Sequence, residues 1–199
     1  ISTVIANRIY QAVGKDTIDI IKENPYSLLG FVKSLDFKVI DEIGIKTGIA
    51  LNNPDRLDNG IIYAINKITE FGHTCVEKEN LLNYCVELLK VDDADISQAI
   101  TRLVLSEKLF VEKINMQEYV FRQSMYLAEE NIAKSVIEHT RFNVEKTDTE
   151  KLINKVCKNT DIILSDEQKK AVDTCLNNMI SIVTGGPGTG KTTIIKCII

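Results

Sequence analysis

The residue types with the clearest chemistry form a glycine-rich run, Gly185 to Thr192, which fits the spacing G-x-x-x-x-G-K-[ST]. Gly185, Gly188 and Gly190 permit backbone conformations and close approaches that a Cβ atom would block. Successive backbone N–H groups can therefore point inward at an anion. The spacing predicts a loop that holds the β- and γ-phosphates of a nucleoside triphosphate.

The side chains that end this run have predicted roles in the same site. Lys191 adds a positive charge between the β- and γ-phosphate oxygens, and the Thr192 hydroxyl is placed to bind Mg²⁺. The first helical turn, Gly190 to Thr193, adds unsatisfied amides and the positive end of a helix dipole. We assign the catalytic role to Lys191 and Thr192. The predicted binding residues are Gly186, Pro187, Gly188, Thr189, Gly190, Lys191, Thr192 and Thr193, with Thr192 as the metal ligand.

Hydrolysis needs groups that this run does not contain. The carboxylates and arginines that complete such a site come from other parts of the fold, and seven residues follow Thr192. The chain also starts at Ile1 without an initiator Met. We expect it to be the N-terminal portion of a larger nucleotide-driven protein, and we expect this portion to be inactive by itself.

The loop must be positioned by a strand before it and a helix after it. Met179 to Thr184 is apolar on both faces, which predicts a strand buried in a parallel sheet. A helix is predicted from Gly190 to the end of the chain. Upstream, Ser165 begins another helix, and Gln168 stands at the position that completes a capping box. Residues 143–199 therefore read as a linker followed by the start of a P-loop α/β domain.

Residues 1–72 are predicted to form short helices joined by tight turns. Apolar residues recur there at helical spacing, as in the segment from Phe37 to Thr47 with its apolar positions Val39, Ile40 and Ile43. Polar residues, proline and glycine separate these segments and predict their ends. The predicted caps and breaks are Gly14, Asp16, Asn24-Pro25, Asp36, Gly48, Pro54 and Gly72.

Residues 73–142 have a different texture. Two helices, over 78–90 and 96–107, precede the short strands Leu109–Val111 and Tyr119–Phe121, which predict a β-hairpin. A further helix is predicted over 124–139. The order helix, helix, hairpin is that of a winged-helix domain, which docks nucleic acid or protein; the alternative is a hairpin that serves only in packing. The predicted fold is thus mostly α, with three regions at 1–72, 73–142 and 143–199.

The composition bounds the class of protein. Apolar residues make up 44% of the 199 residues, and the net charge of −4 gives no overall basic field for a polyanion. We predict no membrane-spanning segment, because no apolar run reaches about 18 residues. The five cysteines are irregularly spaced without a C-x-x-C pair, which favours buried or half-buried thiols in a reducing cytoplasm over a zinc site.

Two segments resemble the opening motifs of superfamily 1 helicases, most closely those of the RecD-like branch. They are Leu164–Val172 and Ile182–Thr193. The resemblance implies a RecA-like motor domain that uses ATP and Mg²⁺, with Gln168 reading the adenine edge. Its capping-box role is the alternative, and the two roles are compatible.

The upstream regions are similar to the N-terminal extension of stand-alone RecD-like helicases. Ala6–Thr17 with Asn24-Pro25 looks like the second half of a helix-hairpin-helix unit, and 37–48 and 60–74 resemble the next segments of that extension. A DNA-binding hairpin of this class has a Gly-x-Gly turn, whereas this chain has Ser34-Leu35-Asp36 flanked by Lys33 and Lys38. A carboxylate there repels phosphate. Lys33 and Lys38 are the DNA-contact candidates, and a helical packing scaffold is the alternative.

The leading hypothesis is an ATP-dependent DNA helicase that moves 5′ to 3′ along single-stranded DNA, a direction implied by the family. DNA-repair proteins are its expected partners. A second hypothesis is an interaction module for protein or DNA, and a third is a P-loop ATPase that is not a helicase. A surface cluster of Lys and Arg would favour DNA, and an exposed apolar patch would favour a protein partner.

Overall fold

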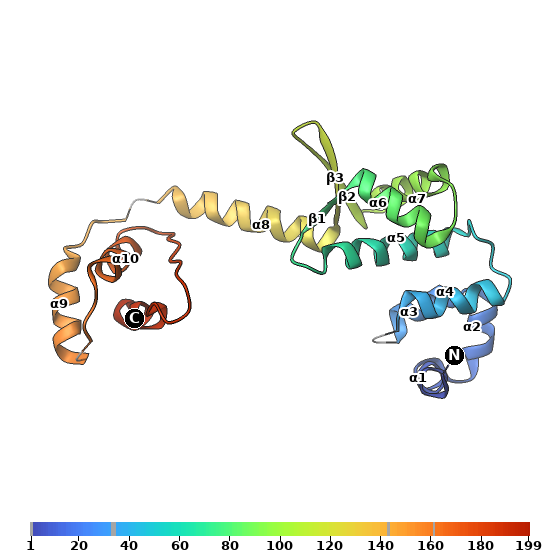
Figure 1. Cartoon of the computed structure of the whole chain (residues 1–199), viewed down its shortest axis with the longest axis horizontal. Coiled ribbons are helices and arrows are strands. Elements are labelled where there is room, and N and C mark those ends of the chain that lie inside the picture. The colour runs from blue at the N-terminus through green and yellow to red at the C-terminus, as the bar shows by residue number, and fades with distance from the viewer. Residues whose placement is uncertain (1, 33–34, 143, 161) are drawn as a thin grey trace. The chain divides into compact units, whose positions relative to one another are not determined.

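The computed structural model describes residues 2–32, 35–142, 144–160 and 162–199. The chain divides into two compact units, Ile1–Ala128 and Glu129–Ile199. Figure 1 labels their helices and strands. The fold is mostly helical with one small sheet, which confirms the predicted fold class. The three-region division at residues 72 and 142 stays a prediction.

Short helices build the first part of unit 1. Gly14, at φ 61°, ends the first helix, and the Asp36 carboxylate caps another by accepting the Lys38 N–H at 2.8 Å. Asp16 stands before its helix as predicted but makes no side-chain cap; the Thr17 hydroxyl instead donates to the Gly14 carbonyl at 2.6 Å. The helices are α1 (Thr3–Val13), α2 (Thr17–Glu23), α3 (Leu28–Phe31) and α4 (Phe37–Lys46), with 3-10 turns η1 (Gly14–Asp16) and η2 (Pro25–Ser27).

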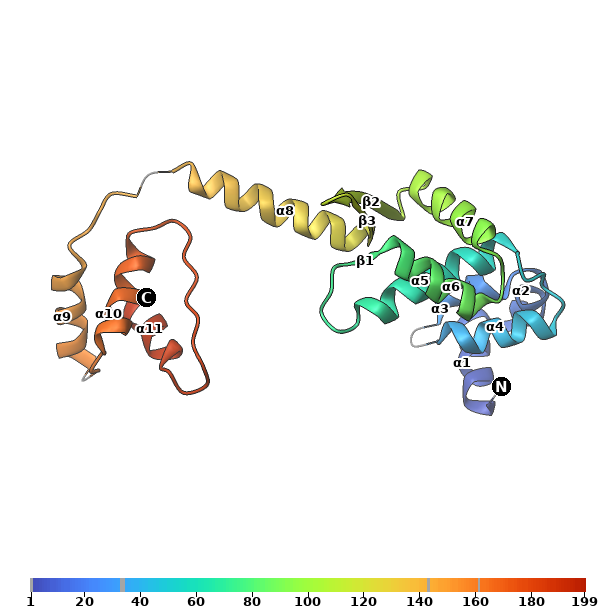
Figure 2. The ribbon, with the colours of Figure 1, turned by 45° about the horizontal axis from the view of Figure 1, so that its top comes forward.

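Three longer helices pack against one another in the same unit, as Figure 2 shows. The Asn53 side chain caps the first of them by accepting the Arg56 N–H at 3.1 Å. Gly60 allows a close crossing, because a Cβ atom there would lie 2.6 Å from a buried Leu89 methyl group. The helices are α5 (Pro54–Thr69), α6 (Lys78–Leu89) and α7 (Asp93–Leu105).

An antiparallel sheet of order β1-β3-β2 completes unit 1. β2 (Leu109–Ile114) and β3 (Gln117–Arg122) form the predicted hairpin. Asn115 and Met116 both have positive φ, which is the geometry of the two-residue turns that hairpins favour. β1 (Cys75–Glu77) was not predicted, because three residues are too few for an alternating pattern to be visible.

One hydrophobic cluster runs through unit 1, with buried members from Ile9 in α1 to Val120 in β3. Ile61, Leu81 and Leu103 are fully buried in it, one from each of the three longer helices. Burial raises the pKa of the Cys85 thiol to about 12, so this cysteine packs as a neutral apolar group. All five cysteines are free and buried or half-buried, as predicted.

α8 (Gln123–Thr140) crosses the boundary between the units, and none of its residues is buried. Its first turn is held by Tyr126, whose ring stacks on Phe110 at 4.4 Å between centroids and meets Phe121 edge-on. No helix among the described residues is long and apolar enough to cross a membrane.

Unit 2 contains three further helices around a smaller core. Its buried residues are Ile153, Leu164, Val172, Ile194 and Cys197. Each helix contributes at least one of them, so the core fixes the positions of the helices on either side of the glycine-rich run. They are α9 (Thr149–Thr160), α10 (Asp166–Leu176) and α11 (Lys191–Ile198).

The predicted strand Met179–Thr184 is wrong for this structure. Figure 2 shows a plain coil between α10 and α11, and residues 181–186 belong to no strand. The Ile182 side chain is 85% exposed. A strand exists only where a neighbour accepts and donates its backbone hydrogen bonds, and no described residue pairs with this segment.

A buried guanidinium joins the helices of unit 1. Arg56 is 1% exposed; its Nε and Nη2 donate to the two Asp41 carboxylate oxygens at 2.7 and 2.9 Å. Its Nη1 donates to the carbonyl oxygens of Leu51 and Leu89 at 2.6 and 2.9 Å. The Tyr26 hydroxyl donates to the same carboxylate, and burial, then this bond and the Asp41 charge, raise the Tyr26 pKa. One side chain thus links α4, α5 and the end of α6.

We predict that Arg56→Ala lowers the free energy of unfolding by about 3–5 kcal/mol, because it leaves a buried carboxylate and two carbonyls without their donor. The matched control is Arg102→Ala, whose ion pair with Asp58 is 39% exposed on the arginine side. That change should cost about 0.2–1 kcal/mol. Urea unfolding of the 199-residue chain followed by circular dichroism measures both. Equal losses would contradict the role given to Arg56.

Candidate nucleotide-binding site

The glycine-rich run forms a turn that leads directly into α11. Gly188 and Gly190 have φ of +78° and +82°, values that L side chains rarely adopt. Pro187 and Gly188 lie exposed at the turn, and the Thr189 N–H closes it on the Gly186 carbonyl at 3.4 Å. The backbone therefore has the tight, glycine-dependent shape that the spacing predicts.

The N-terminus of α11 has free donor groups. Gly190 is the N-cap and brings no side chain to accept them, and the first helical bond is from Ile194 N–H to the Gly190 carbonyl at 3.0 Å. The amides of Lys191, Thr192 and Thr193 precede that bond. Such an end favours an anion, both through its N–H groups and through the helix dipole.

Lys191 lies across the loop. Its ammonium group donates to the carbonyl oxygens of Gly185 and Gly186 at 2.6 and 2.7 Å. The positive charge is therefore held within the turn, at the mouth of the same helix. Thr192 is exposed, and its hydroxyl makes no hydrogen bond within the described part of the chain. A hydroxyl in this state can take a metal ligand role without breaking another bond.

Gln168 contacts both α10 and the loop. Its Oε1 accepts the Ser165 N–H at 2.9 Å, and the Ser165 hydroxyl accepts the Gln168 N–H at 3.3 Å, so the predicted capping box is present. Its Nε2 also donates to the Thr189 carbonyl at 3.1 Å. This contact between positions 168 and 189 joins the two segments that the sequence motifs single out, and helical spacing alone gave no signal for it.

The two lysines predicted to contact DNA are far from this loop in sequence. Lys33 lies outside the described residues, as does Ser34. Lys38 is exposed in the first turn of α4, where its backbone N–H is taken by the Asp36 carboxylate. A carboxylate at a helix N-terminus fills the position that an anion would otherwise take. Direct DNA contact by these residues stays a prediction.

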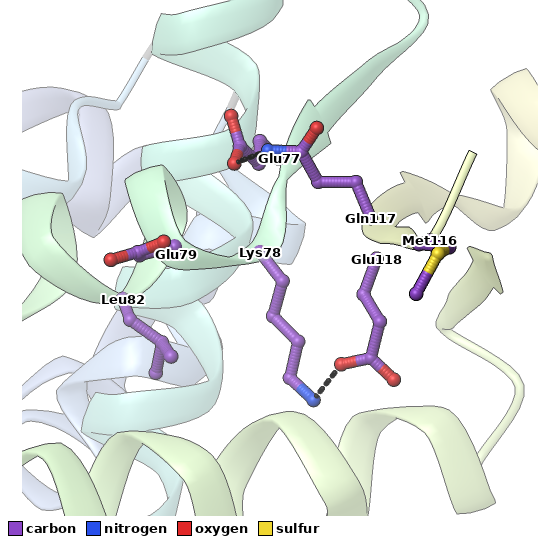
Figure 3. A pocket seen from close by; sticks show the side chains of 7 residues that line it. All are labelled: Glu77, Lys78, Glu79, Leu82, Met116, Gln117 and Glu118. Carbon is purple, nitrogen blue, oxygen red and sulfur yellow. Dashed lines mark hydrogen bonds and ion pairs between the residues drawn. The ribbon is translucent and has the colours of Figure 1, made fainter. Parts of the chain in front are cut away.

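A separate hollow of about 370 Å³ lies beside the β-hairpin and is lined mainly by polar side chains (Figure 3). Lys78 is bonded to Glu118 at 2.7 Å, and Gln117 donates to Glu77. Glu79 adds a third carboxylate. Carboxylates repel phosphate, so this hollow does not suit a nucleotide. No cluster of metal-binding side chains occurs among the described residues.

Two family models match the chain. The model described as the ATP-dependent RecD2 DNA helicase HHH domain matches residues 1–75. The model described as an AAA domain matches residues 168–199, which contain Gln168 and the whole glycine-rich run.

Relatives point to the same proteins. The RecBCD enzyme subunit RecD of Buchnera aphidicola is 34% identical over 136 residues, which are 68% of this chain and 20% of that protein. The ATP-dependent RecD2 DNA helicase of Deinococcus radiodurans is 24% identical over 206 residues, covering 97% of this chain and 28% of that protein. A human protein, clathrin heavy chain 2, is 33% identical over 102 residues, but they make up only 6% of its length.

The chain thus spans between a fifth and a third of the two bacterial relatives' length. Both of its ends match models of one kind of protein, and both bacterial relatives are named for that kind. The resemblance of the two motifs is therefore confirmed: the chain belongs to the RecD-like helicases.

Proposed function

We propose that the protein containing this chain is an ATP-dependent DNA helicase and that its phosphate-binding loop holds ATP with Mg²⁺. The observation that supports this most directly is the loop itself. A cation, free helix amides and glycines at the close approaches stand together over Gly185–Thr193, within the region that the AAA domain model matches.

The residues fit a triphosphate on steric grounds as well. A Cβ atom at Gly185 would meet the Thr189 hydroxyl oxygen at 2.6 Å, and one at Gly190 would meet Gln168 Nε2 at 2.5 Å. Lys191 would exchange its carbonyl partners for phosphate oxygens, and the Thr192 hydroxyl would hold the metal. Bound Mg²⁺ would supply neutralising charge to the phosphates. Gln168 would face the adenine edge.

The partners that we propose are single-stranded DNA and proteins of DNA repair. A helicase of this family would move 5′ to 3′ on one strand, with the phosphate backbone and stacked bases as its track. The name of one relative makes it a subunit of a larger enzyme, which supports protein partners. Five free cysteines support a cytoplasmic location.

A second function is favoured for one surface. The hollow beside the hairpin is lined by Glu77, Glu79 and Glu118, and its one cation, Lys78, is paired. Such a surface opposes DNA. Exposed Met116, at 88%, adds an apolar contact beside it. We propose that the winged-helix region docks a protein partner there, as an addition to the motor function.

We predict that Lys191→Ala in the full-length protein abolishes ATP hydrolysis and its stimulation by single-stranded DNA, because the phosphates lose their cation. Lys196→Ala is the matched control: it removes the same charge from the same helix at an exposed position. It should leave both rates within about twofold. Steady-state ATPase assays with and without DNA measure this. Turnover in the parent protein that ignores DNA would indicate a P-loop ATPase of another kind.

The 199-residue chain alone is predicted to hydrolyse no ATP. Among the described residues, no hydrogen bond or ion pair joins a carboxylate or an arginine to the loop, yet phosphoryl transfer needs such groups. A phosphate-release assay with the purified chain tests this, with its Lys191→Ala variant as the background control. Turnover that the substitution removes would refute the prediction.

A further inference from the structure

Gln168 makes two bonds that together fix how its amide group is oriented. Its oxygen accepts the Ser165 N–H, and its nitrogen donates to the Thr189 carbonyl. The reverse orientation would set oxygen against oxygen and N–H against N–H. Only one orientation therefore satisfies both partners.

The Thr189 end of this contact continues through the loop. The Thr189 hydroxyl donates to the Gly186 carbonyl at 2.9 Å, and the Lys191 ammonium donates to the same carbonyl at 2.7 Å. A continuous series of hydrogen bonds thus runs from Gln168 through Thr189 and Gly186 to the cation. The first turn of α10 is joined by it to the group that would contact phosphate.

Gly190 makes room for this side chain. A Cβ atom at position 190 would lie 2.5 Å from Gln168 Nε2, so the amide rests directly over the N-cap of α11. The glycine is required here by a contact inside the protein, in addition to any requirement from a ligand.

The remaining hydrogen-bonding capacity of the amide is unused. An amide has two N–H donors and two acceptor positions, and each bond takes one of them. One donor and one acceptor remain, which is the set that the N6 and N7 edge of adenine needs. Reading the base therefore does not require Gln168 to release the loop.

We infer that Gln168 is a positioning residue for the phosphate loop: through the Thr189 carbonyl it holds the loop in the shape that takes triphosphate, whether or not a base is bound. This rests on the proposed function in that the loop must take phosphate. The role is separate from the reading of adenine, and it is separate from the capping of α10.

The test uses Mg²⁺-tripolyphosphate, which has phosphates but no base, beside Mg²⁺-ATP, with affinities from calorimetry on the full-length protein. Gln168→Met removes the loop bond and half of the capping box at nearly constant volume. It should weaken tripolyphosphate binding about 2- to 10-fold, the range expected for one hydrogen bond. Ser165→Ala damages the capping box alone; it should lower the melting temperature and leave tripolyphosphate affinity unchanged.

A second pair of variants separates the donor from the cap. Gln168→Glu keeps the acceptor for Ser165 N–H but has no N–H for Thr189, so it should weaken tripolyphosphate binding too. Lys169→Gln changes the net charge by the same amount one residue away, at an exposed position, and should have the smaller effect.

Three results would overturn the inference. If Gln168→Met weakens ATP binding but not tripolyphosphate binding, Gln168 only reads the base, and the proposed function stands. If Ser165→Ala weakens tripolyphosphate as much as Gln168→Met does, the cap of α10 is responsible. If the wild-type protein binds neither ligand, the proposed function fails and the inference fails with it.

Discussion

Backbone carbonyl groups that no helix or sheet satisfies are bonded by side-chain donors at the critical points of both units. In unit 1 the Arg56 guanidinium takes the carbonyls of Leu51 and Leu89. In unit 2 the Lys191 ammonium takes those of Gly185 and Gly186. A buried carbonyl without a partner is costly, so these long cationic side chains allow the chain to turn where regular structure stops.

The two cations differ in what they can do next. Arg56 is enclosed, and its five donors are matched to a carboxylate and two carbonyls, so it acts as a fixed joint. Lys191 is half-buried, and its partners belong to a loop with neighbouring free amides. Its ammonium can exchange partners at small cost. The same kind of contact therefore supports a static core in one unit and a binding site in the other.

Local signals made much of this fold predictable from sequence. The Asp36 cap, the capping box at Ser165 and the hairpin over residues 109–122 depend on neighbours a few positions away, and all three are present. β1 was missed because it is short and its partner β3 lies more than 40 residues further along. Met179–Thr184 was predicted as a strand from its composition, but strand formation depends on a neighbour that composition does not supply.

The site divides in the same way. The glycine spacing and Lys191 could be identified because the motif is contiguous, whereas the Gln168–Thr189 bond spans 21 positions and is visible only in three dimensions. Arg56 was also missed, although it had one signal: a cation in the first turn of a helix opposes the helix dipole. A residue placed against that preference needs a partner elsewhere, and Asp41 is that partner.

The unpaired segment Met179–Thr184 has a consequence for how the chain behaves in concentrated solution. Its six residues include Ile180, Ile182 and Val183, and the segment has no charge and no proline. Ile182 projects to solvent, and the backbone beside it has no partner strand among the described residues. Uncharged, β-branched segments in this state are templates for pairing between molecules. The chain purified by itself is therefore expected to self-associate through this segment, and a charged residue at position 182 would be the simplest protection.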